Sequence, residues 1–233
     1  MKRRKTKEPQ NQIQFDTYQE RGPVKLGPWT SHIWRTDPRH LAFLLARYKF
    51  CAKMLAGKSE VLEVGCGDAL GIPVVLQTVK SVHGVDFEPL VIEDAKARLE
   101  AEGVERCSFS VLDITERAVG SKFDAAYSLD VIEHIPPESE DRFMVNICSS
   151  LRPHAVCIIG TPNIEAQKHA SPASAAGHVN LKSAESLRKL LLCYFHNVFI
   201  FSMNDEVVHT GFYPMAHYLL GLGVGVKEAE AKI

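Results

Sequence analysis

Short apolar segments alternate with amphipathic helical segments along the middle of the sequence, and this alternation restricts the fold more than any other feature. The strand-like runs cover residues 60–65, 81–87, 107–113, 123–132 and 155–163. Between these runs, helices are predicted over 70–79, 88–103 and 138–151. A repeated strand, helix, strand order is typical of a parallel sheet with helices on both faces. We therefore expect an α/β protein with a doubly wound, mostly parallel sheet.

The segments on either side of this block extend the pattern. Further helices are predicted over 39–57, 183–195 and, from its apolar run, 213–224. Gly57 ends the first of these helices, and Ser183 is well placed as the N-cap of the second. Two strand-like runs that meet at Asn204 and Asp205 predict a β-hairpin.

The length and the pattern together support one large domain over residues 39–226. Residues 1–38 are polar, proline-bearing and aperiodic, and we interpret them as an N-terminal tail. The stretch from Trp29 to Trp34 is a candidate lid over a binding site, or equally a strap packed on the sheet. Residues 227–233 are interpreted as a polar C-terminal tail.

The charge balance and the cysteine spacing limit the classes of protein to which this chain can belong. The chain has 27 Lys and Arg against 28 Asp and Glu, so nothing in its net charge supports a nucleic-acid partner. No apolar run reaches the roughly 18 residues that a membrane-spanning helix needs, and no apolar stretch makes the basic start a secretory signal. The six cysteines include no CxxC pair, which predicts reduced thiols and a cytoplasmic location. No feature predicts an oligomeric state.

A glycine-rich bend, VLEVGCGDALG at residues 61–71, includes the end of the first predicted strand. A dinucleotide-binding fingerprint needs a third glycine three residues after the second. That position is Leu70, and Gly71 comes one residue too late. A Walker loop is excluded because no Gly-Lys-Ser/Thr follows. The bend therefore matches neither of these phosphate-binding patterns.

Acidic residues stand at or near the ends of three successive predicted strands. Glu63 lies two residues before the first glycine of the bend, Asp86 lies 21 residues after that glycine, and Asp113 ends the third strand. A carboxylate before the bend would repel a pyrophosphate, whereas one at the end of the second strand can accept hydrogen bonds from both hydroxyls of a ribose. Each acid alone can equally be a helix cap or a solvated strand end. Together, the three favour a positively charged nucleoside as the ligand.

Four segments, VLEVGCGDALG, GVDFEP, VLDIT and FDAAYSLDVIEHI, resemble the successive motifs of class I S-adenosylmethionine-dependent methyltransferases. The resemblance covers about residues 41 to 211. It implies a Rossmann-like seven-stranded sheet whose last strand runs antiparallel, and the predicted terminal hairpin is compatible with that. It also implies a methyltransferase domain over 39–226 with S-adenosyl-L-methionine as its cofactor. Ala69 departs mildly from the family, which often has glycine there.

The resemblance assigns cofactor contacts residue by residue. These are Glu63, Gly65, Cys66 and Gly67 at the methionine moiety, Asp86 at the ribose, Phe87, Asp113 and Ile114 at the adenine, and Ser128 and Leu129 near the sulfonium. The segment VIEHI resembles the Glu-His pair of the branch that methylates small metabolites, quinone precursors and sugars. His134 in that segment is expected near the cofactor, with a core or capping role as the alternative.

The resemblance favours methyl transfer to a small-molecule acceptor, with a hydroxyl oxygen of a metabolite or saccharide as the acceptor atom. A hydroxyl acceptor benefits from a base within hydrogen-bond reach, most often a histidine. The long connection over 161–183 is a candidate binding loop and contains His169 and His178. We favour His178 over His169 as the catalytic base, although each histidine alone is more often a surface or packing residue.

No metal site is predicted, because Asp130, Glu133 and His134 lie close in sequence but no second cluster completes a ligand set. Two alternative functions are a non-catalytic methyltransferase-like partner protein and an oxidoreductase of the NAD type. Intact cofactor motifs argue against the first alternative. Glu63 and the missing third glycine argue against the second.

Overall fold

The computed structural model describes residues 5–228, and a single mixed sheet runs through this part of the chain. Its strands are β1 (Glu60–Val64), β2 (Ser81–Asp86), β3 (Cys107–Val111), β4 (Phe123–Leu129), β5 (Leu151–Pro162), β6 (Phe195–Asn204), β7 (Val207–His209) and β8 (Tyr218–Val226). Their order across the sheet is β3-β2-β1-β4-β5-β8-β6-β7. The first five strands run parallel, and β8 runs antiparallel between β5 and β6. The expected doubly wound, mostly parallel α/β fold with an antiparallel last strand is confirmed.

The last strand, β8, lies where the sequence indicated a helix, so the interpretation of residues 213–224 was wrong. A Cβ added to Gly221 would lie 2.5 Å from the Leu191 side chain, and one added to Gly223 would lie 2.5 Å from Phe195. These glycines therefore let neighbouring side chains pack closely against β8. A central strand buried on both faces is apolar throughout, so its composition resembles that of a buried helix.

The described part of the chain has eight strands in its sheet rather than the seven expected. The predicted hairpin at Asn204 and Asp205 is confirmed, because β6 pairs antiparallel with β7 across it. Asp205 has a φ of 48°, a left-handed conformation that Asp tolerates in turns. The hairpin adds β7 as a three-residue edge strand. It does not supply the antiparallel strand that the resemblance implied, which is β8.

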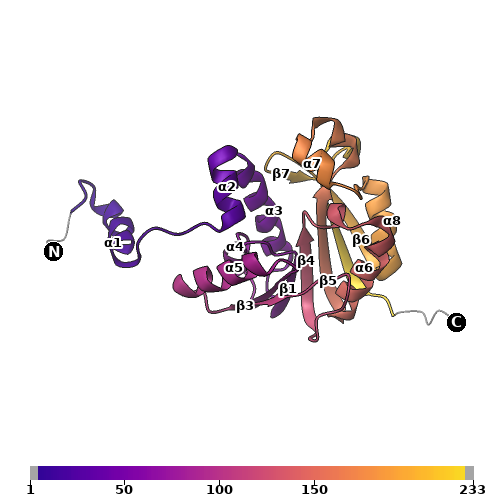
Figure 1. Ribbon diagram of the computed structural model, residues 1–233, viewed down its shortest axis with the longest axis horizontal. Helices are drawn as coiled ribbons and strands as arrows, with labels where there is room; N and C mark the ends of the chain where they lie inside the picture. Colours follow the sequence, from indigo (N-terminus) through magenta and orange to yellow (C-terminus); the bar gives the residue numbers. More distant parts are fainter. Residues whose placement is uncertain (1–4, 229–233) are drawn as a thin grey trace.

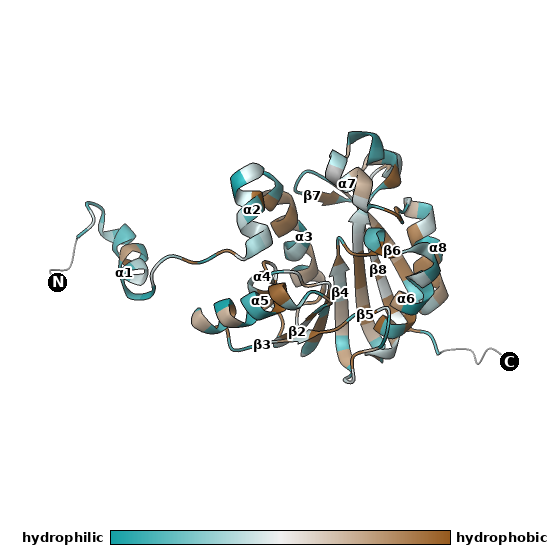
Figure 2. Ribbon diagram, in the orientation of Figure 1, coloured by the Kyte–Doolittle hydropathy of each residue, from teal (hydrophilic) through white to brown (hydrophobic). Residues whose placement is uncertain are grey.

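Helices cover both faces of the sheet (Figure 1). They are α3 (His40–Met54), α4 (Ile72–Val75) and α5 (Pro89–Ala101) on one face, and α6 (Glu140–Ser149) and α8 (Ala184–Tyr194) on the other. Each face has its own hydrophobic cluster, and side chains alternate between the two along a strand, as Val61 and Leu62 do on β1. Figure 2 shows apolar residues gathered on the central strands and hydrophilic ones on the outer surfaces of α6 and α8. The predicted helix over 70–79 is reduced to the single turn of α4.

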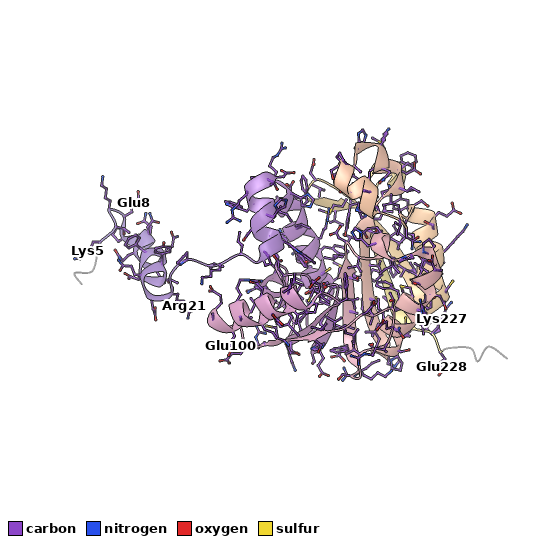
Figure 3. The ribbon with its side chains drawn as sticks, in the orientation of Figure 1. Lys5, Glu8, Arg21, Glu100, Lys227 and Glu228 are labelled. Atoms are coloured by element: carbon purple, nitrogen blue, oxygen red, sulfur yellow. The ribbon has the colours of Figure 1, made fainter. Side chains whose placement is uncertain are left out.

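The N-terminal segment contains helices that its aperiodic sequence did not indicate. They are η1 (Pro9–Asn11), α1 (Gln12–Arg21) and α2 (Pro28–Thr36). No residue of α1 is buried, so this helix has no apolar face for a periodicity argument to detect. It stands away from the body of the molecule, with Glu8 and Arg21 near its two ends (Figures 1 and 3). The basic residues 1–4, and residues 229–233 of the predicted C-terminal tail, lie outside the described residues.

The connection after β5 has a defined structure of its own. η4 (Ile164–His169) and α7 (Pro172–Gly177) fill much of it. Asn163 and Lys182, at its two ends, form an isolated parallel bridge. The other short turns are η2 (Ile132–His134), η3 (Pro137–Ser139) and η5 (Tyr213–Met215). Within residues 5–228, no helix is long and apolar enough to cross a membrane.

Candidate cofactor site

The glycine bend leaves the carboxyl end of β1 with three residues in left-handed conformations. The φ angle is 73° at Gly65, 50° at Gly67 and 59° at Ala69. At Gly65 a side chain is excluded by space as well, because a Cβ would lie 2.2 Å from Val131 Cγ2. Glycine adopts these angles without steric cost, whereas alanine is strained there. Ala69, the departure from the family pattern, is therefore a strained residue.

Backbone N–H groups of the bend are directed at protein acceptors. Gly65 and Cys66 both donate to the carbonyl of Val85, at 2.8 and 3.0 Å. Gly67 donates to Asp86 Oδ2 at 2.9 Å. A phosphate-binding loop directs such groups at its ligand instead. Because these three donors are already used, the bend is poorly suited to a pyrophosphate.

Three buried carboxylates lie in or beside the bend: Glu63, Asp68 and Asp86 are at most 6% exposed. Burial raises the pKa of Glu63 to about 8. The Tyr127 and Tyr48 hydroxyls partly offset that rise, and the charges of the other two carboxylates add to it. Glu63 Oε2 is buried without a hydrogen-bond partner. A cationic ligand beside this oxygen would stabilise the charged carboxylate, so the residues present fit the positively charged methionine end of S-adenosylmethionine.

Asp86 closes β2 and also holds the bend in place. Besides accepting from Gly67, it accepts a hydrogen bond from the backbone of Glu88 at 3.0 Å through Oδ1. These bonds orient the carboxylate at the carboxyl edge of the sheet, where ligands of open α/β sheets bind. The next residue, Phe87, is 70% exposed, so its ring is accessible for packing against a ligand. Recognition of the ribose by Asp86 and of the adenine by Phe87 stays a prediction.

The third predicted acid, Asp113, lies on a loop two residues beyond the end of β3. Its Oδ1 accepts hydrogen bonds from the backbone N–H of Thr115 at 2.8 Å and from Thr115 Oγ1 at 2.7 Å. Asp113 thus caps its own loop. A capping role was one alternative interpretation of each of the three predicted acids. Its neighbour Ile114 is buried in the core. The adenine contacts of both residues stay predictions.

The end of β4 lies beside the end of β1. Ser128 Oγ donates to the carbonyl of Val64 at 2.9 Å and so ties the two strands together just before the bend. Leu129 and Cys66 are both buried. Burial raises the pKa of the Cys66 thiol far above its usual range, so Cys66 contributes shape rather than a reactive thiolate. The predicted cofactor contacts of Ser128, Leu129 and Cys66 are not tested by these placements.

Asp68, a residue that the sequence analysis did not single out, connects the bend to α2. It accepts hydrogen bonds from the backbone N–H of Thr30 at 2.7 Å and from Thr30 Oγ1 at 2.9 Å. Thr30 lies in the first turn of α2, whose N-cap Gly27 has no side chain to accept them, so Asp68 acts as a cap from another segment. The Trp29 ring packs on Gly67, where a Cβ would lie 2.8 Å from it. α2 therefore packs on the bend, and its role as a lid stays a prediction.

An ion pair between a buried arginine and a partly exposed aspartate follows β4. Asp130, with a φ of 57°, accepts two hydrogen bonds from Arg47 Nη1 at 2.8 and 2.7 Å. The guanidinium group lies 3.7 Å from the ring centroid of Tyr218, a cation–π contact. Arg47 could not be identified from the sequence, because its partner is 83 residues away and no pattern within α3 distinguishes it from a solvated arginine.

Glu133, His134 and His178 come together beyond the end of β4. Each offers one atom suited to metal ligation, and these atoms lie within 4.8 Å of one another. The two imidazole rings meet edge to face with their centroids 5.1 Å apart. The expectation of no metal site relied on the lack of a second cluster in the sequence. The connection after β5 brings His178 to the Glu-His pair, and the expectation of no metal stays a prediction.

The two histidines predicted as a catalytic base have different surroundings. His178 is half-buried beside His134, whereas His169 is exposed at the end of η4. Burial and the neighbouring His134 lower the pKa of His178, which favours its neutral form. The structure therefore brings His178, but not His169, into contact with another predicted site residue. A catalytic role for either histidine stays a prediction.

Residues 61–154 match the protein family described as "Methyltransferase domain". A probable S-adenosylmethionine-dependent methyltransferase of Mycolicibacterium smegmatis is 27% identical over 116 residues, which are 50% of this chain and 42% of that protein. A ubiquinone biosynthesis O-methyltransferase of Rickettsia canadensis is 32% identical over 107 residues, 46% of this chain and 44% of that protein. The chain thus spans less than half the length of these two relatives.

Solved structures share the fold. The methyltransferase domain of bacterial CtHen1-C matches with a TM-score of 0.65 at 21% identity, over 78% of this chain and 99% of that one. The N-methyltransferase NodS of Bradyrhizobium japonicum, in complex with S-adenosylhomocysteine, matches with a TM-score of 0.62 at 16% identity, over 90% and 98%. At these identities the likeness shows the fold alone. The chain thus matches the methyltransferase domain family over residues 61–154 and shares the fold of these solved methyltransferases.

Proposed function

We propose that this protein transfers the methyl group of S-adenosylmethionine to a hydroxyl oxygen of a small molecule, a metabolite or a saccharide. The observation that carries the cofactor assignment is the bend, whose inward-directed N–H groups and adjoining buried carboxylates suit a cation and not a pyrophosphate. Similarity to ubiquinone biosynthesis O-methyltransferases supports oxygen as the acceptor atom. The near-neutral net charge supports a small acceptor over a nucleic acid.

The cofactor supplies a methyl group that its positively charged sulfur has already activated. The residues of the chain have to bind it, align the acceptor and exclude water. In this proposal Glu63 and the bend hold the methionine moiety, and Asp86 holds the ribose. The remaining predicted cofactor contacts are Phe87, Asp113 and Ile114 at the adenine, and Ser128 and Leu129 near the sulfonium. His134 is predicted to lie near the cofactor.

A hydroxyl acceptor also has to lose its proton. His178 contacts His134 close to the end of β4, whereas His169 is exposed on η4. We therefore retain His178 as the residue that promotes this proton loss, either as a base or through the bound ion proposed below.

Calorimetric titration of the purified chain with S-adenosylhomocysteine tests the cofactor assignment. We expect a dissociation constant on the order of micromolar, weakened at least tenfold in Asp86→Asn and unchanged in Asp205→Asn, a matched change at the hairpin turn. NAD should show no saturable binding. A chain that binds NAD and not S-adenosylhomocysteine would falsify the proposal in favour of an oxidoreductase. A chain that binds neither would favour the non-catalytic partner.

Acceptor specificity is then tested with labelled S-adenosylmethionine and matched alcohols, phenols, amines and thiols. The proposal expects label in O-methyl products. Label that enters only amines or thiols would contradict the choice of oxygen while leaving the cofactor assignment intact.

A further inference from the structure

The cluster of Glu133, His134 and His178 is held together by backbone hydrogen bonds between two distant segments. The carbonyl of Glu133 accepts from Val179 at 2.8 Å and from Asn180 at 3.0 Å. His134 Nδ1 lies 3.0 Å from the carbonyl oxygen of Gly177, the residue that precedes His178 in the chain. The segment 177–180 is therefore clamped onto η2, and the arrangement of the three side chains is built into the fold.

Two polar atoms of this cluster are left without hydrogen-bond partners. Glu133 is 1% exposed. Its Oε2 accepts from Thr161 Oγ1 at 3.0 Å, but its Oε1 is buried with no hydrogen-bond partner. His178 Nδ1 is likewise buried and unpartnered. A buried polar atom without a partner is unfavourable, and two of them occur in one cluster.

The hydrogen bond of His134 sets its tautomer. A carbonyl oxygen only accepts, so His134 Nδ1 donates to Gly177, and Nε2 keeps its lone pair. A ring that donates one N–H to a backbone carbonyl while presenting the other nitrogen is the usual arrangement of a metal-binding histidine. Two donor atoms each about 2.1 Å from one ion lie at most about 4.2 Å apart. The three donor atoms lie within 4.8 Å of one another, so small side-chain rotations would bring them to the separation that one ion needs.

The charges around the cluster do not oppose a cation. Arg47, whose charge acts on Glu133, is paired with Asp130 through two hydrogen bonds, and Lys182 is paired with Glu140. Once a cation displaces its proton, the Glu133 carboxylate would supply a negative charge to the cluster itself. Two imidazoles and one carboxylate suit a divalent first-row transition metal better than Mg²⁺ or Ca²⁺, which prefer oxygen ligands. Three protein ligands leave coordination positions open, as in catalytic zinc sites.

We propose that Glu133, His134 and His178 bind a divalent first-row transition-metal ion, and that an open position of this ion takes the hydroxyl oxygen of the acceptor. The role of the ion rests on the proposed function, whereas its binding does not. The site is next to the bend, because Val131, two residues before Glu133, packs against Gly65. In this arrangement His178 is a ligand rather than a free base.

The chemistry of the step balances without a redox change. Coordination lowers the pKa of the acceptor hydroxyl, so its proton passes to water near neutral pH. A lone pair of the oxygen forms the bond to the methyl carbon, while the carbon–sulfur bond breaks and its electron pair stays on sulfur. The products are the O-methylated acceptor and S-adenosylhomocysteine.

Titration of untagged, full-length protein with Co²⁺, after treatment with a chelator and desalting, tests the site. Calorimetry and the visible absorption of Co²⁺ should both report one ion per chain. Glu133→Gln keeps the size of the side chain and an oxygen acceptor for Thr161, and it should weaken Co²⁺ binding at least about tenfold. His178→Ala should do the same. His154→Ala, which removes an exposed histidine at the start of β5, is the matched control and should bind like the wild type.

The proposal is overturned if the wild type binds no Co²⁺ below millimolar concentration, or if Glu133→Gln and His178→Ala both bind it as tightly as His154→Ala. S-adenosylhomocysteine is titrated into the same samples, and its retained binding shows that each variant is folded. Binding of S-adenosylhomocysteine without Co²⁺ binding would leave the methyltransferase proposal standing and remove the metal site. Binding of Co²⁺ without binding of S-adenosylhomocysteine would leave the metal site standing and remove the methyltransferase proposal.

Discussion

Glu63 is a buried acid whose protonation depends on what lies beside it. Burial raises its pKa from 4.5 to about 8. At pH 7 the folded protein holds a proton that the unfolded chain has released, so the contribution of Glu63 to the free energy of unfolding falls as the pH rises from about 4.5 to 8. A cation bound at the bend would favour the charged form and release this proton.

Glu63→Gln should therefore stabilise the ligand-free protein at high pH. Each pKa unit corresponds to about 1.4 kcal/mol, and we expect the variant to be at least about 1 kcal/mol more stable than the wild type at pH 9, with little difference at pH 4.5. Urea unfolding across this range measures the difference. Some loss of stability with rising pH will remain in the variant, because burial also raises the pKa of Glu133. If Glu63→Gln showed the same pH dependence as the wild type and as Glu206→Gln, an exposed control, the raised pKa would be wrong.

Gly65 has no room for a side chain. Its φ of 73° strains any other residue, and a Cβ would lie 2.2 Å from Val131 Cγ2. Gly65→Ala should therefore displace the bend, destabilise the protein by roughly 1–3 kcal/mol and weaken S-adenosylhomocysteine binding at least tenfold. Gly120→Ala is the matched control, since a Cβ there meets nothing within 4 Å. Unfolding curves and calorimetry decide the matter, and equal affinities for the two variants would contradict a tightly packed bend.

At the scale of elements, α2 depends on a residue outside itself. Its N-cap, Gly27, makes no side-chain bond, and Asp68 accepts the hydrogen bonds of Thr30 from within the bend. A carboxylate at this position also interacts favourably with the positive end of the helix. The order of α2 and the shape of the bend are thus coupled through one side chain.

Asp68→Ala should cost about 1–3 kcal/mol, because it leaves the buried donors of Thr30 without an acceptor. It should also speed trypsin cleavage after Arg35, in α2. Asp37→Ala is the control at the other end of α2, where an acid opposes the helix dipole and its loss should cost little. Cleavage rates and urea unfolding measure both effects. Equal behaviour of the two variants would show that Asp68 does not anchor the helix.

At the scale of the molecule, the N-terminal segment has two parts with different relations to the body. α1 buries none of its residues and stands apart (Figure 1). α2 packs on the bend through Trp29 and Thr30. The division of the chain at residues 38 and 226 stays a prediction, and we propose that α2 acts together with the domain that follows it.

Removal of residues 1–22 should leave the free energy of unfolding within about 0.5 kcal/mol of the full chain and the affinity for S-adenosylhomocysteine unchanged. Removal of residues 1–38 should lower both, because it also takes away the contacts of α2 with Asp68 and Gly67. Chemical unfolding and calorimetry on the two truncated chains test this. A short truncation as damaging as the long one would show that α1 supports the fold.

Local chemistry was sufficient to predict much of this molecule from its sequence. Five parallel strands, the helices over α3, α5, α6 and α8, and the glycine bend all follow from side-chain periodicity and backbone preferences that act over a few residues. Ser183 is another such case, since it forms a capping box with Ser186 as the N-cap of α8. The placement of Glu63 and Asp86 at the edge of the sheet follows in the same way from strand ends.

Only the tertiary structure decided which distant residues meet. Arg47 with Asp130, Thr30 with Asp68, and His178 with the Glu133–His134 pair are joined by the path of the chain, because residues tens of positions apart leave no periodic signal in either segment. The strand β8 escaped prediction for a related reason. This strand lies between β5 and β6 and is covered by helices on both faces. Its sequence is therefore apolar throughout and lacks the alternation that marks a strand. The sequence by itself determined the sheet, the bend and its carboxylates, whereas packing alone assembled the ion pair, the cap on α2 and the cluster of ligands.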